Sequence, residues 1–267
     1  MPIALVRRPA ASLATQCELT FVDRVEIAVD VLERQHAAYR DALAAAGAHV
    51  IALDAIEALP DSVFVEDAAV VLDGIAVLTR PGTPSRAPEP AHVADALAAQ
   101  RTLARIDAPG TLEGGDVLRI GRTLYVGLTT RTNREGIEQL ARLVRPHGYT
   151  VVPVATPGAL HLKTACTALD EETLLANPAW IDLAPFAGFR VLHVADGEAF
   201  ASNVLPVDDT RIVNAAFPRT RERIEAHAQA TGLRTIAVDI SEFGKAEAGL
   251  TCMSLVFDNA TELRSLG

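Results

Sequence analysis

The sequence contains few cysteines and few aromatic residues: 3 of its 267 residues are cysteine and 4% are aromatic. The cysteines are scattered along the chain, and none of them forms a Cys-x-x-Cys pair. This pattern excludes both the disulfide framework of a small secreted domain and the paired ligands of a structural zinc site. A reducing cytoplasm is the natural setting for such a chain, and we expect neither a metal nor another cofactor.

Long apolar runs are also missing. The apolar run at residues 3–6 is followed at once by Arg7, Arg8 and Pro9, so it is too short for the core of a signal peptide. No other stretch approaches the ~18 consecutive apolar residues that a membrane-spanning helix needs. The sequence therefore predicts neither export nor a membrane partner.

Basic residues are outnumbered by acidic ones. The chain has 24 Lys and Arg against 34 Asp and Glu, which gives a formal net charge of −10. Because nucleic-acid binding depends on clustered Lys and Arg, no nucleic acid is expected as a partner. A small cationic substrate fits this charge better, although surplus acidic residues also serve simply to keep a protein surface soluble.

What the sequence does contain is a recurring hairpin pattern. Two apolar runs flank a turn at residues 68–80, 115–129, 163–178 and 202–216. The pair Asp73 and Gly74, in the first of these, is a favoured two-residue hairpin turn because both central positions need a positive φ. The hairpins recur about every 40 to 50 residues, which is typical of a repeat architecture.

A helix-like segment and then a short strand follow the hairpins. Thr132 and Glu135 predict a capping box at the start of one helix, and residues 150–154 predict the strand after it. Thr220 is expected to cap a later helix, which precedes a strand at residues 234–240. The order hairpin, helix, strand therefore recurs along the chain.

The two ends of the chain complete the pattern. Four internal hairpins leave one unit incomplete, unless the apolar run at residues 250–257 pairs with the run at residues 3–6. That pairing would close a ring of five units. We therefore predict an α/β fold, a five-bladed α/β propeller that forms a single domain over residues 1–267, with a central channel where several blades contribute residues. An ordinary α/β sandwich with irregular hairpins is the alternative.

Cys252 and His161 are the candidate nucleophile and base. Cys252 lies in GLTCMSL, at the start of an apolar strand, and on this evidence alone it is either a small core residue or a reactive thiol. His161 lies in ALHLKTA, just before the third hairpin. A cysteine and a histidine that are distant in sequence but joined by the fold form the minimal nucleophile and base arrangement.

Acidic residues stand at the starts of two hairpins. PDSVFVED contains Asp61, Glu66 and Asp67, and TLEGGD contains Glu113 and Asp116. A carboxylate at the start of a buried strand is costly unless a cation lies beside it, and a planar guanidinium offers a matching fork of N–H donors. The alternative is that these are solvent-exposed acids in turns.

Two arginines lie just after hairpins, Arg86 in RPGTPSR and Arg131 in TTRTN. An arginine can hold a carboxylate with two parallel hydrogen bonds, so either residue is a candidate for the carboxylate of a substrate. Without further information each of them is equally well a surface arginine.

Taken in order, the motifs PDSVFVED, TRPG followed by SR, LEGGD, RTN, LHLKT and TCMSL resemble, along nearly the whole chain, those of the dimethylargininases in the guanidino-modifying pentein superfamily. The resemblance implies the five-bladed propeller and a cysteine hydrolase that converts Nω-methylated arginines to citrulline and dimethylamine or methylamine. It places the catalytic residues at Cys252, His161 and Glu113. It places substrate binding at Leu19 (through its carbonyl), Asp61, Glu66, Asp67, Arg86 and Arg131.

The choice of substrate depends on a difference between relatives. Arginine deiminases and amidinotransferases typically carry an acid two residues after the histidine, where this chain has Lys163. Without that acid a methylated nitrogen is tolerated more easily, which favours methylarginines over arginine. The alternatives are an arginine deiminase or a hydrolase of another guanidine, and a non-catalytic pentein binding protein. The resemblance leaves a homodimer open.

Overall fold

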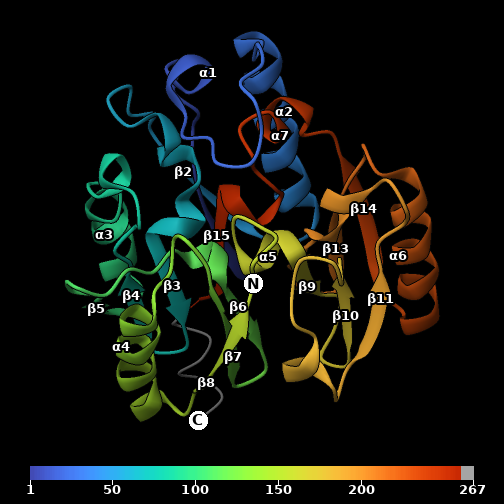
Figure 1. The fold of residues 1–267 in the computed structure, drawn as a ribbon. Coiled ribbons are helices and arrows are strands. Elements are labelled where there is room, and N and C mark those ends of the chain that lie inside the picture. Colours follow the sequence, from blue (N-terminus) through green and yellow to red (C-terminus); the bar gives the residue numbers. More distant parts are fainter. Residues whose placement is uncertain (260–267) are drawn as a thin grey trace.

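The computed structural model describes residues 1–259, which form five three-stranded sheets around a central axis (Figure 1). The sheets contain, in order of pairing, β15 (Ser254–Asp258), β1 (Pro2–Arg7) and β2 (His49–Leu53); β3 (Ala69–Leu72), β4 (Ile75–Leu78) and β5 (Thr102–Arg105); β6 (Val117–Ile120), β7 (Thr123–Leu128) and β8 (Thr150–Ala155); β9 (Cys166–Ala168), β10 (Thr173–Ala176) and β11 (Arg190–His193); and β12 (Leu205–Val207), β13 (Thr210–Asn214) and β14 (Arg234–Val238).

Every sheet has the same pairing pattern. The first two strands pair antiparallel as a hairpin, and the third strand pairs parallel with the middle one, as in β6, β7 and β8. The sheet at the chain ends follows the same rule, because β15 pairs antiparallel with β1 and β1 pairs parallel with β2. The predicted five-bladed α/β propeller is therefore confirmed, and the sandwich alternative is wrong.

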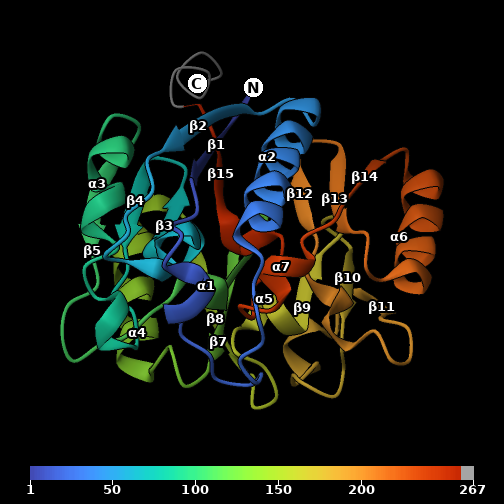
Figure 2. The same cartoon turned by 90° about the horizontal axis from the view of Figure 1, so that it is seen from above.

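The longer helices link the middle strand of a sheet to its third strand. The α-helices are α1 (Leu13–Gln16), α2 (Val29–Ala45), α3 (Ala91–Ala98), α4 (Arg134–Val144), α5 (Leu162–Ala165), α6 (Pro218–Thr231) and α7 (Ser241–Gly244). The long links α2, α3, α4 and α6 lie at the periphery of the propeller (Figures 1 and 2). Between β10 and β11 the link contains only the 3₁₀ turn η6 (Ala184–Phe186) within the described residues.

The apolar face of α4 shows why these links pack on the blades. Ile137, Leu140 and Val144 are spaced to share one face of the helix, and all three are buried in one cluster with Leu124 and Val126 of β7. Burial of apolar side chains between the helix and the strands is the main stabilising contribution to such an interface. The predicted helix and strand order is confirmed here.

The predicted helix caps are wrong. Asn133 caps α4 in place of Thr132, because its side chain accepts a hydrogen bond from the backbone nitrogen of Gly136. Thr220 lies inside the first turn of α6, whose cap position is Phe217. The hydroxyls of the two threonines instead accept hydrogen bonds from neighbouring backbone segments, which local sequence patterns do not specify.

A short helical turn precedes the first strand of each sheet. These turns are η2 (Val65–Ala68) before β3, η4 (Gly114–Asp116) before β6, α5 before β9, η7 (Ala199–Ser202) before β12 and η8 (Thr251–Met253) before β15. Neighbouring turns contact one another: η2 contacts η4 and η8, and α5 contacts η4 and η7. The turns therefore form a ring at one end of the first strands, and this ring carries several candidate residues from distant parts of the sequence.

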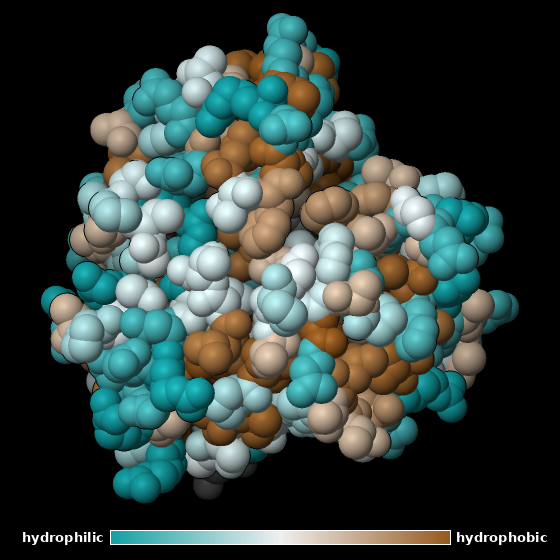
Figure 3. Space-filling view, in the orientation of Figure 1, coloured by the Kyte–Doolittle hydropathy of each residue, from teal (hydrophilic) through white to brown (hydrophobic). Residues whose placement is uncertain are grey.

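No helix within residues 1–259 combines the length and the apolar character that a membrane crossing requires. On the face seen in Figure 3, apolar patches are interrupted by polar side chains rather than joined into a belt.

Candidate active site

A pocket lies at the ring of short turns. Six of the residues that the sequence analysis selected line it: Asp61, Asp67, Arg86, Arg131, His161 and Cys252. They come from four different blades and from the connections between them. The structure therefore brings together a thiol, an imidazole, two carboxylates and two guanidinium groups that are dispersed along 192 positions of the sequence, from Asp61 to Cys252.

His161 and Glu113 form the most buried polar pair of the site. The Nε2 atom of His161 lies 2.7 Å from Oε2 of Glu113, which is fully buried. Oε1 of Glu113 accepts a hydrogen bond from the backbone nitrogen of Gly82 at 2.9 Å. Burial alone would lower the pKa of His161, but the charge of Asp67 and the hydrogen bond to Glu113 raise it to about 9. The imidazole is therefore protonated at neutral pH.

Asp67 stays ionised in the pocket. Its Oδ2 accepts a hydrogen bond from Nη1 of Arg86 at 2.8 Å, and its Oδ1 accepts one from the backbone nitrogen of Gly115 at 2.9 Å. Burial would raise the pKa of Asp67, but the positive charges of His161 and Arg86 lower it to about 2. The pocket therefore keeps a negative charge next to the protonated histidine.

The two arginines differ in their partners. Nε and Nη2 of Arg86 donate to Glu89, while Nη1 donates to Asp67, so two carboxylates already neutralise this guanidinium. Arg131 instead donates hydrogen bonds to two hydroxyls, those of Thr83 at 3.0 Å and Thr20 at 2.9 Å, and its one carboxylate neighbour, Oε1 of Glu113, lies 3.6 Å from Nη1. A substrate carboxylate can replace neutral hydroxyls more readily than it can replace carboxylates. Arg131 is thus the better placed of the two for that role.

Cys252 lies in η8 and is partly exposed to the pocket. Its sulfur accepts a hydrogen bond from the backbone nitrogen of Gly249 at 3.3 Å. Burial raises the pKa of the thiol, and the carboxylates of Glu66 and Asp67 raise it further. Without a bound cation the nucleophile candidate is therefore a protonated thiol.

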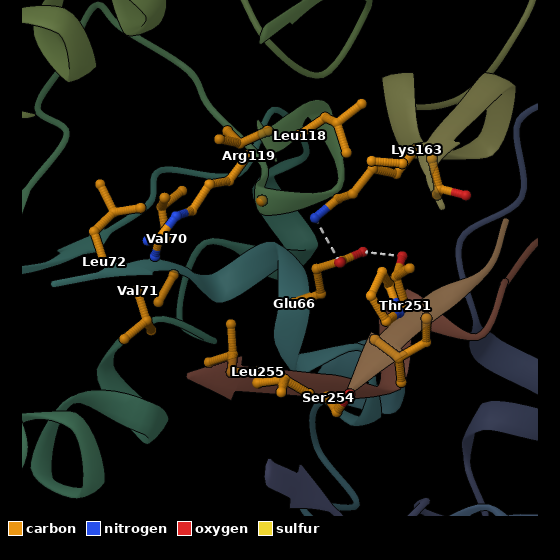
Figure 4. Close-up of a pocket in the computed structure, with 18 of the residues that line it drawn as sticks. Glu66, Val70, Val71, Leu72, Leu118, Arg119, Lys163, Thr251, Ser254 and Leu255 are labelled. Atoms are coloured by element: carbon orange, nitrogen blue, oxygen red, sulfur yellow. Dashed lines mark hydrogen bonds and ion pairs between the residues drawn. The ribbon is translucent and has the colours of Figure 1, made fainter. Parts of the chain in front are cut away.

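Glu66 does not line this pocket. It borders a second cavity of about 230 Å³, enclosed by the first strands of the sheets beyond the ring of turns. There the side chain of Lys163 lies 2.6 Å from Oε1 of Glu66, and the hydroxyl of Thr251 donates to Oε2 at 2.7 Å (Figure 4). Glu66 therefore influences the pocket through its charge, and Lys163 is held away from the pocket by this ion pair.

Leu19 belongs to the chain segment before α2, beside the pocket. The backbone nitrogen of its neighbour Glu18 donates to Oδ2 of Asp61 at 3.1 Å. Glu18 lines the pocket, whereas Leu19 packs, half buried, against the core. The structure thus places this segment next to Asp61, the acid with which the sequence analysis grouped it.

Several known proteins are similar to this chain in sequence. Residues 55–186 match the family model described as arginine deiminase. An N(G),N(G)-dimethylarginine dimethylaminohydrolase of Pseudomonas aeruginosa is 36% identical over 257 residues, which are 95% of this chain and 98% of that protein. A protein of the same name from Streptomyces coelicolor is 40% identical over 253 residues, 94% of this chain and 95% of that protein. The chain belongs to the dimethylarginine dimethylaminohydrolase family.

Two solved structures, one from this family and one of low sequence identity, have the same fold. The Pseudomonas aeruginosa dimethylarginine dimethylaminohydrolase, solved as a cysteine-to-serine mutant complexed with citrulline, has a TM-score of 0.89 and 34% identity, covering 95% of this chain and 98% of that chain. The N-terminal domain of ArgZ, a cyanobacterial arginine dihydrolase, has a TM-score of 0.81 at 20% identity and covers 96% of this chain and 98% of that chain. The expected family and fold are both confirmed.

Some residues of the site were not given a role by the sequence analysis. Oδ1 of Asp116 accepts a hydrogen bond from the backbone nitrogen of Leu162 at 2.9 Å, next to His161, and burial raises the pKa of Asp116 to about 6. Glu247 also lines the pocket. Its backbone has a φ of 60°, a left-handed conformation that the neighbouring sequence does not predict. Its only sequence signal is its position five residues before Cys252.

The site also contains a group that could ligate a metal. One ligand atom each from Asp67, Glu113 and His161 lie within 4.8 Å of one another. Two of these residues, His161 and Glu113, already share a hydrogen bond, and a cation there would compete with the proton on the imidazole. The expectation of a metal-free reaction stays a prediction of the sequence analysis.

The charges around Cys252 predict its reactivity. We expect iodoacetamide to alkylate Cys252 slowly at pH 8 and the Glu66→Gln variant to react faster, because one carboxylate that raises the thiol pKa is gone. Each unit by which the pKa falls gives about tenfold more thiolate. Mass spectrometry of the Cys252 peptide measures the rate, and Glu135→Gln, an exposed acid in α4, is the control. Equal rates in wild type and Glu66→Gln would contradict this electrostatic account.

Proposed function

We propose that the pocket hydrolyses Nω-methylated arginines, asymmetric dimethylarginine and monomethylarginine, to citrulline and dimethylamine or methylamine. The observation that carries this proposal is the shared pocket of Cys252, the protonated His161 and the ionised Asp67. The names of the similar proteins and the citrulline complex of a structural neighbour support it.

The pocket offers a partner for each charged group of such a substrate. The guanidinium cation fits beside Asp67, where it meets a fixed negative charge. The α-carboxylate fits on Arg131, with the positive charge of Arg86 nearby. The α-amine fits between Asp61 and the backbone carbonyl of Leu19. In this proposal Glu66 acts on the reacting thiol from the second cavity.

The chemistry follows from these charges. A bound guanidinium lowers the pKa of the Cys252 thiol, and the resulting thiolate attacks the central guanidinium carbon. The carbon–nitrogen bond to the methylated nitrogen breaks as His161 donates its proton to the departing amine, which leaves a covalent thiouronium intermediate. The carbon attacked is already cationic, so proximity and desolvation matter more than an oxyanion hole.

Hydrolysis completes the cycle. His161, now neutral, takes a proton from water, and the hydroxide attacks the intermediate carbon. The sulfur–carbon bond then breaks, citrulline leaves and Cys252 is regenerated. In this scheme Glu113 orients His161 and keeps it basic enough to be protonated again.

Arginine deiminase activity is the second candidate function. It is favoured by the match of residues 55–186 to the arginine deiminase family. The position two residues after His161 is Lys163, however, so no carboxylate stands there to bind unsubstituted guanidinium nitrogens. Lys163 instead forms an ion pair with Glu66. We therefore place methylarginines first.

Three further expectations stay predictions. We propose a single catalytic domain over residues 1–267, because the ring of sheets is closed by β1 and β15; residues 260–267 lie outside the described part. A cytoplasmic location is expected from the scattered cysteines, none of which forms a Cys-x-x-Cys pair. A homodimer also stays a prediction, and sedimentation of the purified chain tests it.

Turnover measurements test the proposed reaction. We expect purified protein, without added metal, to release citrulline and the matching amine from both methylarginines, and Cys252→Ala to lose at least about 10³-fold in kcat. Cys166→Ala, at a buried cysteine of β9 outside the pocket, is the control. Turnover of arginine alone would favour the deiminase, and no citrulline from any of the three would contradict both.

The raised pKa of His161 predicts a pH dependence. The step that releases the amine needs the imidazolium, which is present below a pKa of about 9 and is lost as the pH rises through it. We therefore expect kcat/KM to fall above about pH 9. Glu113→Gln removes a charge that raises this pKa, so its fall should begin at lower pH. An unchanged high-pH limb in that variant, relative to wild type and Glu135→Gln, would contradict the assignment.

A further inference from the structure

The segment that carries the nucleophile also holds a loop at the edge of the pocket. We call residues 17–28 the pocket loop; it leads from α1 to α2 and passes beside α7 (Figure 2). Side chains of the segment at residues 241–252 bind its backbone. Glu242 accepts a hydrogen bond from the nitrogen of Ala28 at 2.9 Å, and Lys245 donates to the carbonyl of Glu26 at 2.9 Å.

Glu247 makes the largest set of these contacts. Its Oε2 accepts a hydrogen bond from the backbone nitrogen of Thr20 at 2.8 Å, and its Oε1 accepts those of Phe21 and of Val22, the latter at 2.8 Å. Three consecutive N–H groups thus converge on one carboxylate, an arrangement in which the charge strengthens each hydrogen bond. The backbone of Glu247 adopts its left-handed φ of 60°, which is costly for a residue with a side chain.

Apolar burial holds the two ends of the pocket loop, where Cys17 and Ile27 are buried in the core, but not its middle. Phe21 is 51% exposed and Val25 is 50% exposed, so these large side chains give little hydrophobic anchoring. Polar contacts to the rest of the protein therefore hold the middle of the loop in place.

Two of the other polar contacts involve groups that a substrate would use. Asp61 binds the backbone nitrogen of Glu18, and Arg131 binds the hydroxyl of Thr20. In the proposed complex these two side chains meet the α-amine and the α-carboxylate of the substrate, which compete for the same atoms. The proposed complex places no substrate group on Glu247, so its hydrogen bonds with three backbone nitrogens of the loop are kept when the substrate binds.

We propose that Glu247 is a positioning residue: its carboxylate fixes residues 20–22 so that the carbonyl of Leu19 faces the α-amine of the bound substrate. Glu247 itself lines the pocket, and two residues further on Gly249 donates its N–H to the sulfur of Cys252. One short segment therefore aligns both the amine-binding loop and the nucleophile. This inference rests on the proposed function for the identity of the amine.

Amide hydrogen exchange tests the contact without any assumption about the reaction. In Glu247→Gln one oxygen becomes an NH₂ donor that faces N–H groups, so at least one hydrogen bond is lost. We expect the amides of Thr20, Phe21 and Val22 to exchange about 10- to 100-fold faster. Glu57→Gln is the matched control, because Glu57 accepts the backbone nitrogens of Ala11 and Ser12 at 3.1 Å away from the pocket. Unchanged exchange at residues 20–22 in Glu247→Gln would overturn the proposal.

Kinetics then separate positioning from a general loss of structure. For asymmetric dimethylarginine we expect the KM of Glu247→Gln to rise about tenfold or more with little change in kcat. For N,N-dimethyl-N′-butylguanidine, which lacks the α-amine and the α-carboxylate, kcat/KM should stay at the wild-type value.

An equal loss on both compounds, or faster exchange with an unchanged KM, would overturn the positioning role. A wild-type protein that turns over no methylarginine would contradict the proposed function instead. In that case the exchange experiment decides by itself whether Glu247 holds the loop.

Discussion

The pairing of β1 with β15 is the constraint on which the rest of the structure depends. It joins the two ends of the described chain, with Leu5 opposite Leu255, and so closes the ring of five sheets. The turn η8 directly precedes β15, so the same pairing brings Cys252 against η2 and the neighbouring turns. The hydroxyl of Thr251 bonds to Glu66 across 185 positions of sequence and secures that contact. Closure of the ring and assembly of the site therefore depend on the same contacts.

Charge pairing inside the ring determines what the pocket can do. Asp67 is kept ionised and His161 is kept protonated because each lies beside the opposite charge, whereas Cys252 is kept as a thiol by burial and by two carboxylates. A guanidinium ligand beside Asp67 would favour the thiolate, and its positive charge would also lower the pKa of His161 from its value of about 9. The site is thus electrostatically arranged so that the nucleophile forms when a cation binds, which restrains reaction of the free thiol with other electrophiles.

The sequence predicted the parts of this structure that depend on local patterns. Hairpins with turns such as Asp73-Gly74, and the apolar spacing of α4, follow from near neighbours along the chain. The positions of Glu66 and Glu247 could not be predicted in this way. Glu66 is turned away from the pocket by Lys163 and Thr251, and Glu247 binds amides more than 220 residues earlier in the sequence. Such partners are set by how blades meet, and a single sequence carries no local signal for that.

The central claim is that Cys252 attacks the guanidinium carbon and expels the methylated nitrogen. Rapid acid quenching of the protein during turnover of asymmetric dimethylarginine, followed by mass spectrometry of its peptides, tests this step directly. The account predicts an adduct on Cys252 that retains the substrate carbon skeleton and has lost both methyl groups. An adduct that keeps the methyl groups, or a modification of another residue with Cys252 unmodified, would contradict it.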